Sequence, residues 1–92
     1  MKFLIQHQRA TVGNDVTVGA EADGKEQISR VTITLDGFMI GDDPVDPAGV
    51  SYERQFVQVG DASPRRPHHL TVTITDPQGN TKSADRRWED VT

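Results

Sequence analysis

Apolar and polar residues alternate strictly in several short stretches of the chain. Residues 31–35 read Val-Thr-Ile-Thr-Leu, residues 70–75 read Leu-Thr-Val-Thr-Ile-Thr, and residues 16–22 follow the same pattern with smaller side chains. Successive side chains of a β-strand point to opposite faces of the sheet, so a period of two is typical of a strand with one buried and one exposed face. The pattern therefore predicts a half-buried strand at each of these stretches.

Short segments rich in glycine, proline, aspartate and asparagine separate the apolar stretches. Asp36-Gly37 lies between two apolar runs, which predicts a tight hairpin. In residues 76–80, Asp-Pro-Gln-Gly-Asn, the Asp76 carboxylate can accept hydrogen bonds from turn amides, and Gly79 or Asn80 can adopt a left-handed conformation. This segment therefore predicts a reversal of the chain into the last strand.

The remaining extended stretches are shorter or less regular. They are residues 3–7, 38–40, 50–59 and 81–88, of which 3–7 and 38–40 are expected to be short edge strands. Residues 41–49 contain two prolines, two glycines and three aspartates. Because proline lacks the amide donor of a sheet ladder and fixes its own dihedral angle, we expect this segment to be an irregular loop. A second loop is predicted at residues 60–67.

These stretches amount to about seven short strands, and no stretch shows the apolar spacing of three and four that marks a helix. Strands without intervening helices exclude parallel βαβ units, and an antiparallel domain of this length usually closes as a sandwich. We therefore predict that residues 1–92 form a single all-β domain. The side chains expected to point inward are Val16, Val18, Ala20, Ile28, Val31, Ile33, Leu35, Tyr52, Phe56, Leu70, Val72, Ile74 and Trp88.

The overall charge is mildly acidic, with 10 Lys and Arg residues against 14 Asp and Glu and a net charge of −4. Nucleic acids and anionic lipids are bound chiefly through basic patches, so the charge argues against both as partners. The absence of cysteine excludes a disulfide framework and a thiolate nucleophile. The apolar run at residues 3–5 is too short for a secretory signal, and no stretch is long enough to span a bilayer. We therefore expect a cytoplasmic or assembly-associated protein rather than a secreted one.

Two motifs resemble the sequence of bacterial immunoglobulin-like domains. The late motif, "HHLTVTITDPQGN", matches the family at His68, Leu70, Val72, Asp76, Gly79 and Asn80. The early motif, "ISRVTITLDG", matches it at Ile28, Val31, Ile33, Asp36 and Gly37. The resemblance covers residues 14–90 and implies an immunoglobulin-like antiparallel β-sandwich of about seven strands. The chain departs from the family at Pro67, where glycine is usual, and in the proline-rich segment 41–49.

The family implies adhesion, spacing or partner binding and no shared chemistry, because a fold of this kind does not fix a function. We therefore expect a non-enzymatic protein-interaction or structural module whose partner is another protein. Such a module can form part of a larger assembly, such as a phage particle or a secretion apparatus, or can bind and block another protein. The alternative is a carbohydrate-binding module, which would need an exposed platform of aromatic rings from Trp88, Tyr52 or the phenylalanines. No cofactor is expected.

Two groups of residues suggest metal binding. Asp42, Asp43 and Asp46 offer the carboxylate oxygens that Ca²⁺ prefers, but their spacing is not that of an EF-hand, and a solvated acidic loop is the favoured interpretation. His68 and His69 are adjacent on a predicted strand, so their rings point to opposite faces and do not easily share an ion. We expect one of them to be half-buried and the other exposed.

No pattern indicates catalysis. The serines lie in turn-like or exposed strand positions without a nucleophile elbow, and no glycine-rich phosphate loop is present. The two basic pairs, Arg65-Arg66 and Arg86-Arg87, favour solubility over phosphate binding. Trp88 is interpreted as a residue that fills the core and not as an exposed aromatic residue that binds a ligand, because few other aromatic residues are available to fill the interior.

A row of threonines is the strongest candidate for a binding surface. Thr32, Thr34, Thr71, Thr73 and Thr75 would lie on one outer face if the strands that contain them pair, and His69 would lie beside them. A flat face of this kind would suit a protein partner. Exposed strand positions also favour β-branched polar residues such as threonine without any role in binding. Both interpretations remain open from the sequence.

Overall fold

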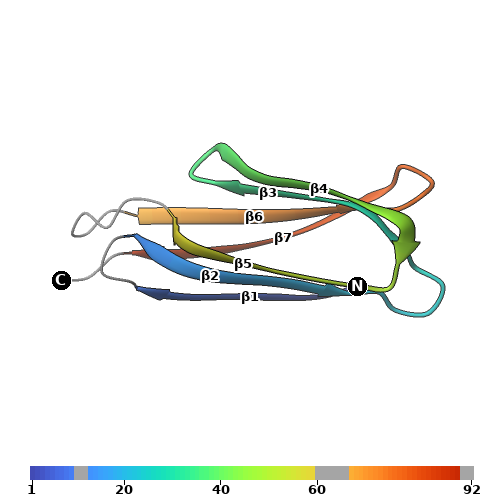
Figure 1. Cartoon of the computed structure of the whole chain (residues 1–92), viewed down its shortest axis with the longest axis horizontal. Helices are drawn as coiled ribbons and strands as arrows, with labels where there is room; N and C mark the ends of the chain where they lie inside the picture. The colour runs from blue at the N-terminus through green and yellow to red at the C-terminus, as the bar shows by residue number, and fades with distance from the viewer. Residues whose placement is uncertain (10–12, 60–66, 90–92) are drawn as a thin grey trace.

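The structure is a computed structural model that describes residues 1–9, 13–59 and 67–89. The described residues form seven antiparallel strands (Figure 1). These are β1 (Lys2–Arg9), β2 (Asn14–Glu21), β3 (Ile28–Leu35), β4 (Phe38–Gly49), β5 (Ser51–Val59), β6 (Pro67–Thr75) and β7 (Thr81–Glu89). They build a three-stranded sheet in the order β1-β2-β5 and a four-stranded sheet in the order β4-β3-β6-β7. The predicted class, an immunoglobulin-like antiparallel β-sandwich of about seven strands, is confirmed.

The core lies between the two sheets and is made of the side chains that the alternating pattern places inward. The buried apolar residues are Val16, Val18, Ala20, Ile28, Val31, Ile33, Leu35, Phe56, Leu70, Val72, Ile74 and Trp88. Full burial of a large apolar side chain contributes roughly 1.5–3 kcal/mol, so this cluster supplies the main stabilisation of the sandwich. Trp88 is confirmed as part of the core.

Tyr52 is the one predicted core residue that is only half-buried. Its ring packs against the core, but its hydroxyl donates a hydrogen bond of 2.5 Å to Oδ2 of Asp43. A phenol placed inside an apolar core would lose its hydrogen bonds to water, so the tyrosine stays at the margin of the core, where a carboxylate can accept a hydrogen bond from its hydroxyl.

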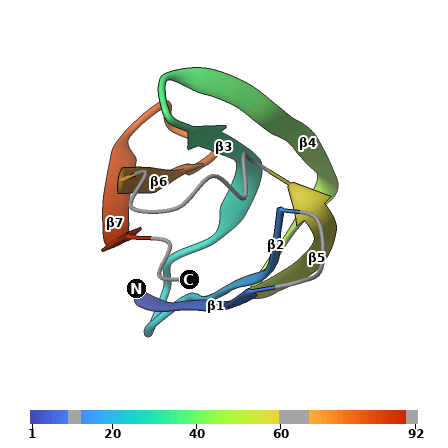
Figure 2. The same cartoon turned by 90° about the vertical axis from the view of Figure 1, so that its left-hand side faces the viewer.

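The prediction of an irregular loop at residues 41–49 was wrong, because strand β4 runs without interruption from Phe38 to Gly49. The two prolines are tolerated because β4 is an edge strand, in which alternate amides point away from the neighbouring strand and need no partner. The pairing with β3 shifts between Ile33 and Thr34 and again between Ile28 and Arg30. In Figure 2 the strand bends from the four-stranded sheet toward β5 of the other sheet.

Both hairpin turns singled out in the sequence have the predicted conformation. Asp36 and Gly37 join β3 to β4 with φ angles of 53° and 86°. Gly79 joins β6 to β7 with a φ angle of 89°. In this second turn, Oδ1 of Asp76 accepts hydrogen bonds from the amides of Gln78 (2.9 Å) and Asn80 (2.8 Å). The turns are therefore set by residues that tolerate or stabilise a left-handed backbone.

Polar side chains close the sandwich along the side between β4 and β5. Nη1 of Arg54 donates to both carboxylate oxygens of Asp43, at 3.0 and 2.9 Å, and its guanidinium lies 4.5 Å from the centre of the Phe56 ring. A Cβ atom at Gly41 would come within 3.0 Å of that Nη1 atom and 3.2 Å of the Phe56 ring. Glycine at this position therefore allows Arg54 and Phe56 to pass beneath β4.

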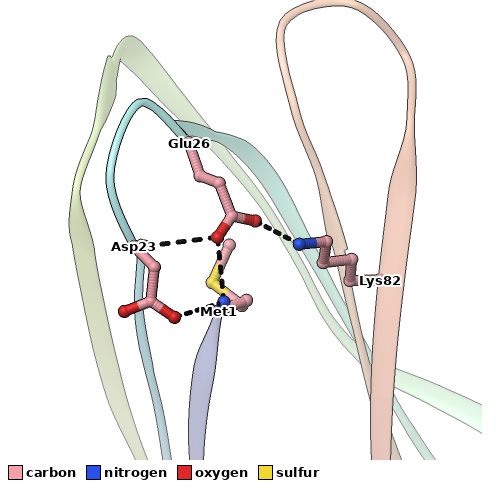
Figure 3. A network of polar contacts seen from close by, with 4 residues as sticks. All are labelled: Met1, Asp23, Glu26 and Lys82. Carbon is pink, nitrogen blue, oxygen red and sulfur yellow. Dashed lines mark hydrogen bonds and ion pairs between the residues drawn. The ribbon is translucent and has the colours of Figure 1, made fainter.

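The side between β7 and β1 is closed at both ends of the strands. Nη1 of Arg86 donates to the Ile5 carbonyl at 2.8 Å, and the Trp88 ring stacks on His7 with centroids 4.4 Å apart. At the far end, Glu26 accepts bonds from the Met1 amino group (2.9 Å) and from Lys82 (2.5 Å), which brings three segments together (Figure 3). The Lys82 ammonium and the amino group hold the pKa of Glu26 down at about 2.

Candidate interaction surface

The outer face of the four-stranded sheet carries rows of hydroxyl side chains. The cross-strand pairs Thr32–Thr73 and Thr34–Thr71 lie between β3 and β6, and Thr73–Ser83 lies between β6 and β7. Thr75 lies between Arg30 of β3 and Thr81 of β7. The structure thus brings together the five threonines that the sequence nominated, because β3 and β6 pair in register. We call this surface, made of Thr32, Thr34, His69, Thr71, Thr73 and Thr75, the Thr face.

Polar side chains pair with one another across the strands at the margins of the Thr face. Nη1 of Arg30 lies 2.6 Å from Oδ1 of Asp42 on the β4 side. On the β7 side, Nε2 of His69 lies 2.7 Å from Oδ2 of Asp85. Within the face, the hydroxyls of Thr73 and Ser83 are 3.1 Å apart. The centre of the surface is therefore uncharged, and polar pairs lie at its border together with Arg87.

An exposed apolar pair lies at the tip of the β3–β4 hairpin, with Met39 opposite Thr34 of the Thr face and Phe38 opposite the inward-pointing Leu35. Phe38 is 76% exposed, and Met39 is 61% exposed. Both lie in the segment predicted to be a short edge strand, and neither was among the predicted site residues. The alternating pattern would place one of the two inward, so their exposure could not be predicted without knowing where the hairpin ends relative to the core.

The hairpin tip is fixed to the neighbouring strand by Asp36. Its Oδ1 accepts the backbone amide of His69 at 2.8 Å, and its Oδ2 lies 2.6 Å from Nδ1 of His68. The Asp36 amide in turn donates to the His69 carbonyl at 2.9 Å. These contacts hold Phe38 and Met39 in a defined position, so the apolar pair is presented by a supported turn rather than by a loose loop.

The two adjacent histidines point to opposite faces, as predicted. His68 is fully buried rather than half-buried, because its ring lies against Trp88 with centroids 5.5 Å apart and its Nδ1 contacts Asp36. His69 lies on the outer face beside Asp85. Within residues 1–9, 13–59 and 67–89, no three His, Asp or Glu side chains converge in a way that could hold a metal ion.

Two of the three aspartates considered for Ca²⁺ are engaged with cationic or hydroxyl groups. Asp42 pairs with Arg30, and Asp43 accepts bonds from Tyr52 and Arg54. The hydrogen bond from Tyr52 and the Arg54 guanidinium lower the pKa of Asp43. Partial burial and the hydrogen bond to Asp43 raise the pKa of Tyr52 to about 12. These carboxylates stabilise the β4 edge and do not converge on one point.

The remaining sequence candidates are dispersed over the molecule. Arg86 points to the inner side, toward β1, and Arg87 alternates with it to the outer side, so the two do not form a joint patch. The pair Arg65-Arg66 and the predicted loop at 60–67 fall on residues that, apart from Pro67, lie outside the described part of the chain. Ser29 donates to the Thr75 carbonyl at 2.9 Å and serves the sheet.

Comparison with known proteins supports the fold assignment. No protein-family model matches the chain, and no curated protein matches it in sequence. Among solved structures, it is similar to the fibronectin(III)-like modules of Clostridium thermocellum CbhA, with 21% sequence identity and a TM-score of 0.53. The similarity covers 96% of this chain and 97% of that chain. The resemblance to immunoglobulin-like domains is thus confirmed at the level of the fold.

The described residues contain no helix that is long and apolar enough to cross a membrane.

Proposed function

We propose that the protein is a non-enzymatic interaction module that binds another protein through the Thr face and the adjoining hairpin tip. The observation that carries this proposal is the uncharged hydroxyl surface with the exposed Met39 at its end and the exposed Phe38 on the other side of the same hairpin tip. Protein interfaces combine a few aromatic or methionine anchors with a polar rim, and charged residues are depleted at their centre. The similarity to fibronectin(III)-like modules agrees with a structural or binding role.

A protein partner is favoured over a carbohydrate. Sugar-binding platforms need exposed aromatic rings that lie flat against the ligand. Trp88 and Phe56 are buried in the core, and Tyr52 is half-buried against Asp43. Phe38 is the only described aromatic residue that is mostly exposed, and it lies at a hairpin tip rather than across a sheet face. The alternative of a carbohydrate-binding module therefore lacks its main structural element.

The absence of catalysis is part of the same proposal. His69 and Asp85 form a pair on the outer face, and Ser83 is the nearest serine along β7. Ser83 pairs with Thr73, however, whereas His69 pairs with Arg87, two rows further along the sheet. Ser83 therefore lies outside hydrogen-bonding reach of the imidazole, and the group does not have the geometry of an activated nucleophile.

The proposal is tested by two matched arginine substitutions. Thr73→Arg places a long cation in the middle of the Thr face, and Thr17→Arg places the same group on β2, the central strand of the other sheet. Both threonines are half-buried and outward-facing, so the substitutions make similar demands on the fold. Loss of stability is checked for each variant through the fluorescence of Trp88, the single tryptophan.

The purified variants are then compared as bait in extracts of the native host. We expect wild type and Thr17→Arg to retain the same partner protein and Thr73→Arg to lose it. Retention by both variants, or loss through Thr17→Arg alone, would place the interaction elsewhere and contradict the proposal. Soluble oligosaccharides added to the same assay should leave the retained protein unchanged.

A further inference from the structure

The two described sheets have four edge strands, and three of these are blocked against pairing with another strand. Strand β4 contains Pro44 and Pro47 and two shifts of register. Strand β5 faces β4, to which it is linked by Tyr52 and Arg54. Strand β1 has its Ile5 carbonyl occupied by Arg86. Prolines, bulges and covered backbone groups are the usual means of preventing edge-to-edge association.

Strand β7 contacts β1 through the inward-pointing side chains of Arg86 and Trp88, but it contains neither a proline nor a shift of register. It pairs with β6 without a shift of register from Thr81 to Glu89, and its sequence, Thr-Lys-Ser-Ala-Asp-Arg-Arg-Trp-Glu, contains neither proline nor glycine. Its other edge has no neighbour among the described strands of the four-stranded sheet. A regular strand of this length presents a row of backbone donors and acceptors that can extend the sheet.

The backbone groups that point away from β6 can be assigned from the hairpin. The Asp76 amide donates to the Asn80 carbonyl at 2.9 Å, so this pair is hydrogen-bonded. Hydrogen-bonded and non-hydrogen-bonded pairs alternate along an antiparallel ladder. The amides and carbonyls of Thr81, Ser83, Asp85 and Arg87 therefore point to the free edge. The side chains of the same residues lie on the outer face of the sheet.

We propose that β7 pairs antiparallel with β7 of a second copy of this chain, which joins the two four-stranded sheets into one. The charged residues of β7 determine which register of this pairing is favourable. With Arg86 at the two-fold axis, Asp85 of each copy lies opposite Arg87 of the other, and symmetry makes this favourable pair twice. The two Arg86 side chains turn to the inner side, where each donates to an Ile5 carbonyl.

The neighbouring registers bring like charges together. With Asp85 at the axis, the two Asp85 carboxylates oppose each other, and with Ala84 at the axis, Lys82 opposes Arg86 twice. Strand β1, which also lacks proline, carries Lys2 and Arg9 and no acidic residue, so it offers no comparable pairing with itself. The net charge of −4 opposes self-association in general, but β7 itself carries three basic and two acidic residues.

This inference does not depend on the proposed function, although pairing at β7 would join the Thr faces of two copies into one surface. It is tested by sedimentation equilibrium of wild type at concentrations up to about 1 mM, because an interface of one strand pair buries little surface and is expected to be weak. The variants are Asp85→Arg, Arg87→Asp and the double variant that exchanges the two charges. Glu53→Arg, an equal change of charge at an exposed position of β5, is the control.

We expect wild type and Glu53→Arg to form dimers, and each single variant of β7 to raise the dimer dissociation constant about tenfold or more. The double variant restores the opposite charges in the same register and is expected to recover most of the affinity. A monomeric wild type at the highest concentration, a dimer indifferent to Asp85→Arg, or a double variant as weak as the single ones would each overturn the proposal.

A second measurement does not require variants. Hydrogen exchange of the Ser83, Asp85 and Arg87 amides in wild type should slow as the protein is concentrated, because these amides point to the free edge and become bonded in the dimer. Amides at the free edge of β1 serve as the internal reference. Equal exchange of the β7 amides in dilute and concentrated samples would contradict the pairing even if a dimer forms.

Discussion

At the scale of single residues, polar side chains lie at the margins of a small core and form hydrogen bonds between the edge strands of the two sheets. Tyr52 illustrates this most clearly, since its ring contacts the core while its hydroxyl reaches Asp43. Arg54 bonds the same carboxylate and covers the Phe56 ring. The alternating pattern predicted the inward direction of Tyr52, but it could not predict the contact with Asp43. That residue lies on β4, and the two prolines of β4 led to the prediction of a loop there.

Ionisation of Tyr52 should therefore require unusually alkaline conditions. The raised pKa of about 12, against 10.0 for a free phenol, means that folding disfavours the phenolate. Its contribution to stability is present below pH 10 and is lost as the pH rises toward 12. The chain has a single tyrosine, so ultraviolet absorbance of the phenolate reports this residue alone. Asp43→Asn should shift the titration toward 10, and an unshifted titration in wild type would contradict the contact.

Gly79 should be required for the last turn because its φ angle of 89° is unfavourable for a β-branched residue. Gly79→Val is expected to lower the free energy of unfolding by about 1–3 kcal/mol. Asp76→Ala removes the acceptor for the Gln78 and Asn80 amides and should cost about 1 kcal/mol. Urea titrations followed by Trp88 fluorescence measure both. Thr73→Ser, on the outer face of the same hairpin, should stay within about 0.5 kcal/mol of wild type.

At the scale of elements, the strands that could be predicted from the sequence are those with one face on the core and the other exposed. Strands β3 and β6 alternate apolar and hydroxyl residues because they lie in the middle of a sheet with one face on the core, and the sequence pattern located both. Strand β4 lies at an edge and bends toward the other sheet, so its side chains follow no single pattern. Its prolines mark an edge strand and not a loop. The two cases can be told apart only from the position of the strand in the sheet.

The same difference explains which parts of the candidate surface were predicted. The Thr face follows from alternation together with the pairing of β3 and β6. Phe38 and Met39 were not predicted to belong to it, because their exposure depends on where the β3–β4 hairpin ends relative to the core. The polar pairs at the margins, Arg30–Asp42 and His69–Asp85, depend on the register between strands, which the pattern of a single strand does not contain.

The start of β1 should respond to acid through Glu26, which joins Met1 to Lys82 (Figure 3). Its folded-state pKa of about 2 lies below the ordinary value of 4.5, so its carboxylate stabilises the fold above pH 4.5 and ceases to do so as the pH falls toward 2. The difference in unfolding free energy between wild type and Glu26→Gln should therefore be largest near neutral pH and shrink over this interval. A difference that is constant with pH would mean that the charge of Glu26 has no role.

At the scale of the whole molecule, we propose that the outer face of the four-stranded sheet is the surface that binds a partner protein. The most direct measurement is photo-crosslinking in the native host, with a photoreactive amino acid placed at Thr73 and, in a second sample, at Thr17 of the opposite sheet. We expect a discrete crosslinked product with another protein from position 73 and none from position 17. The same product from position 17, or a product from position 17 alone, would contradict it.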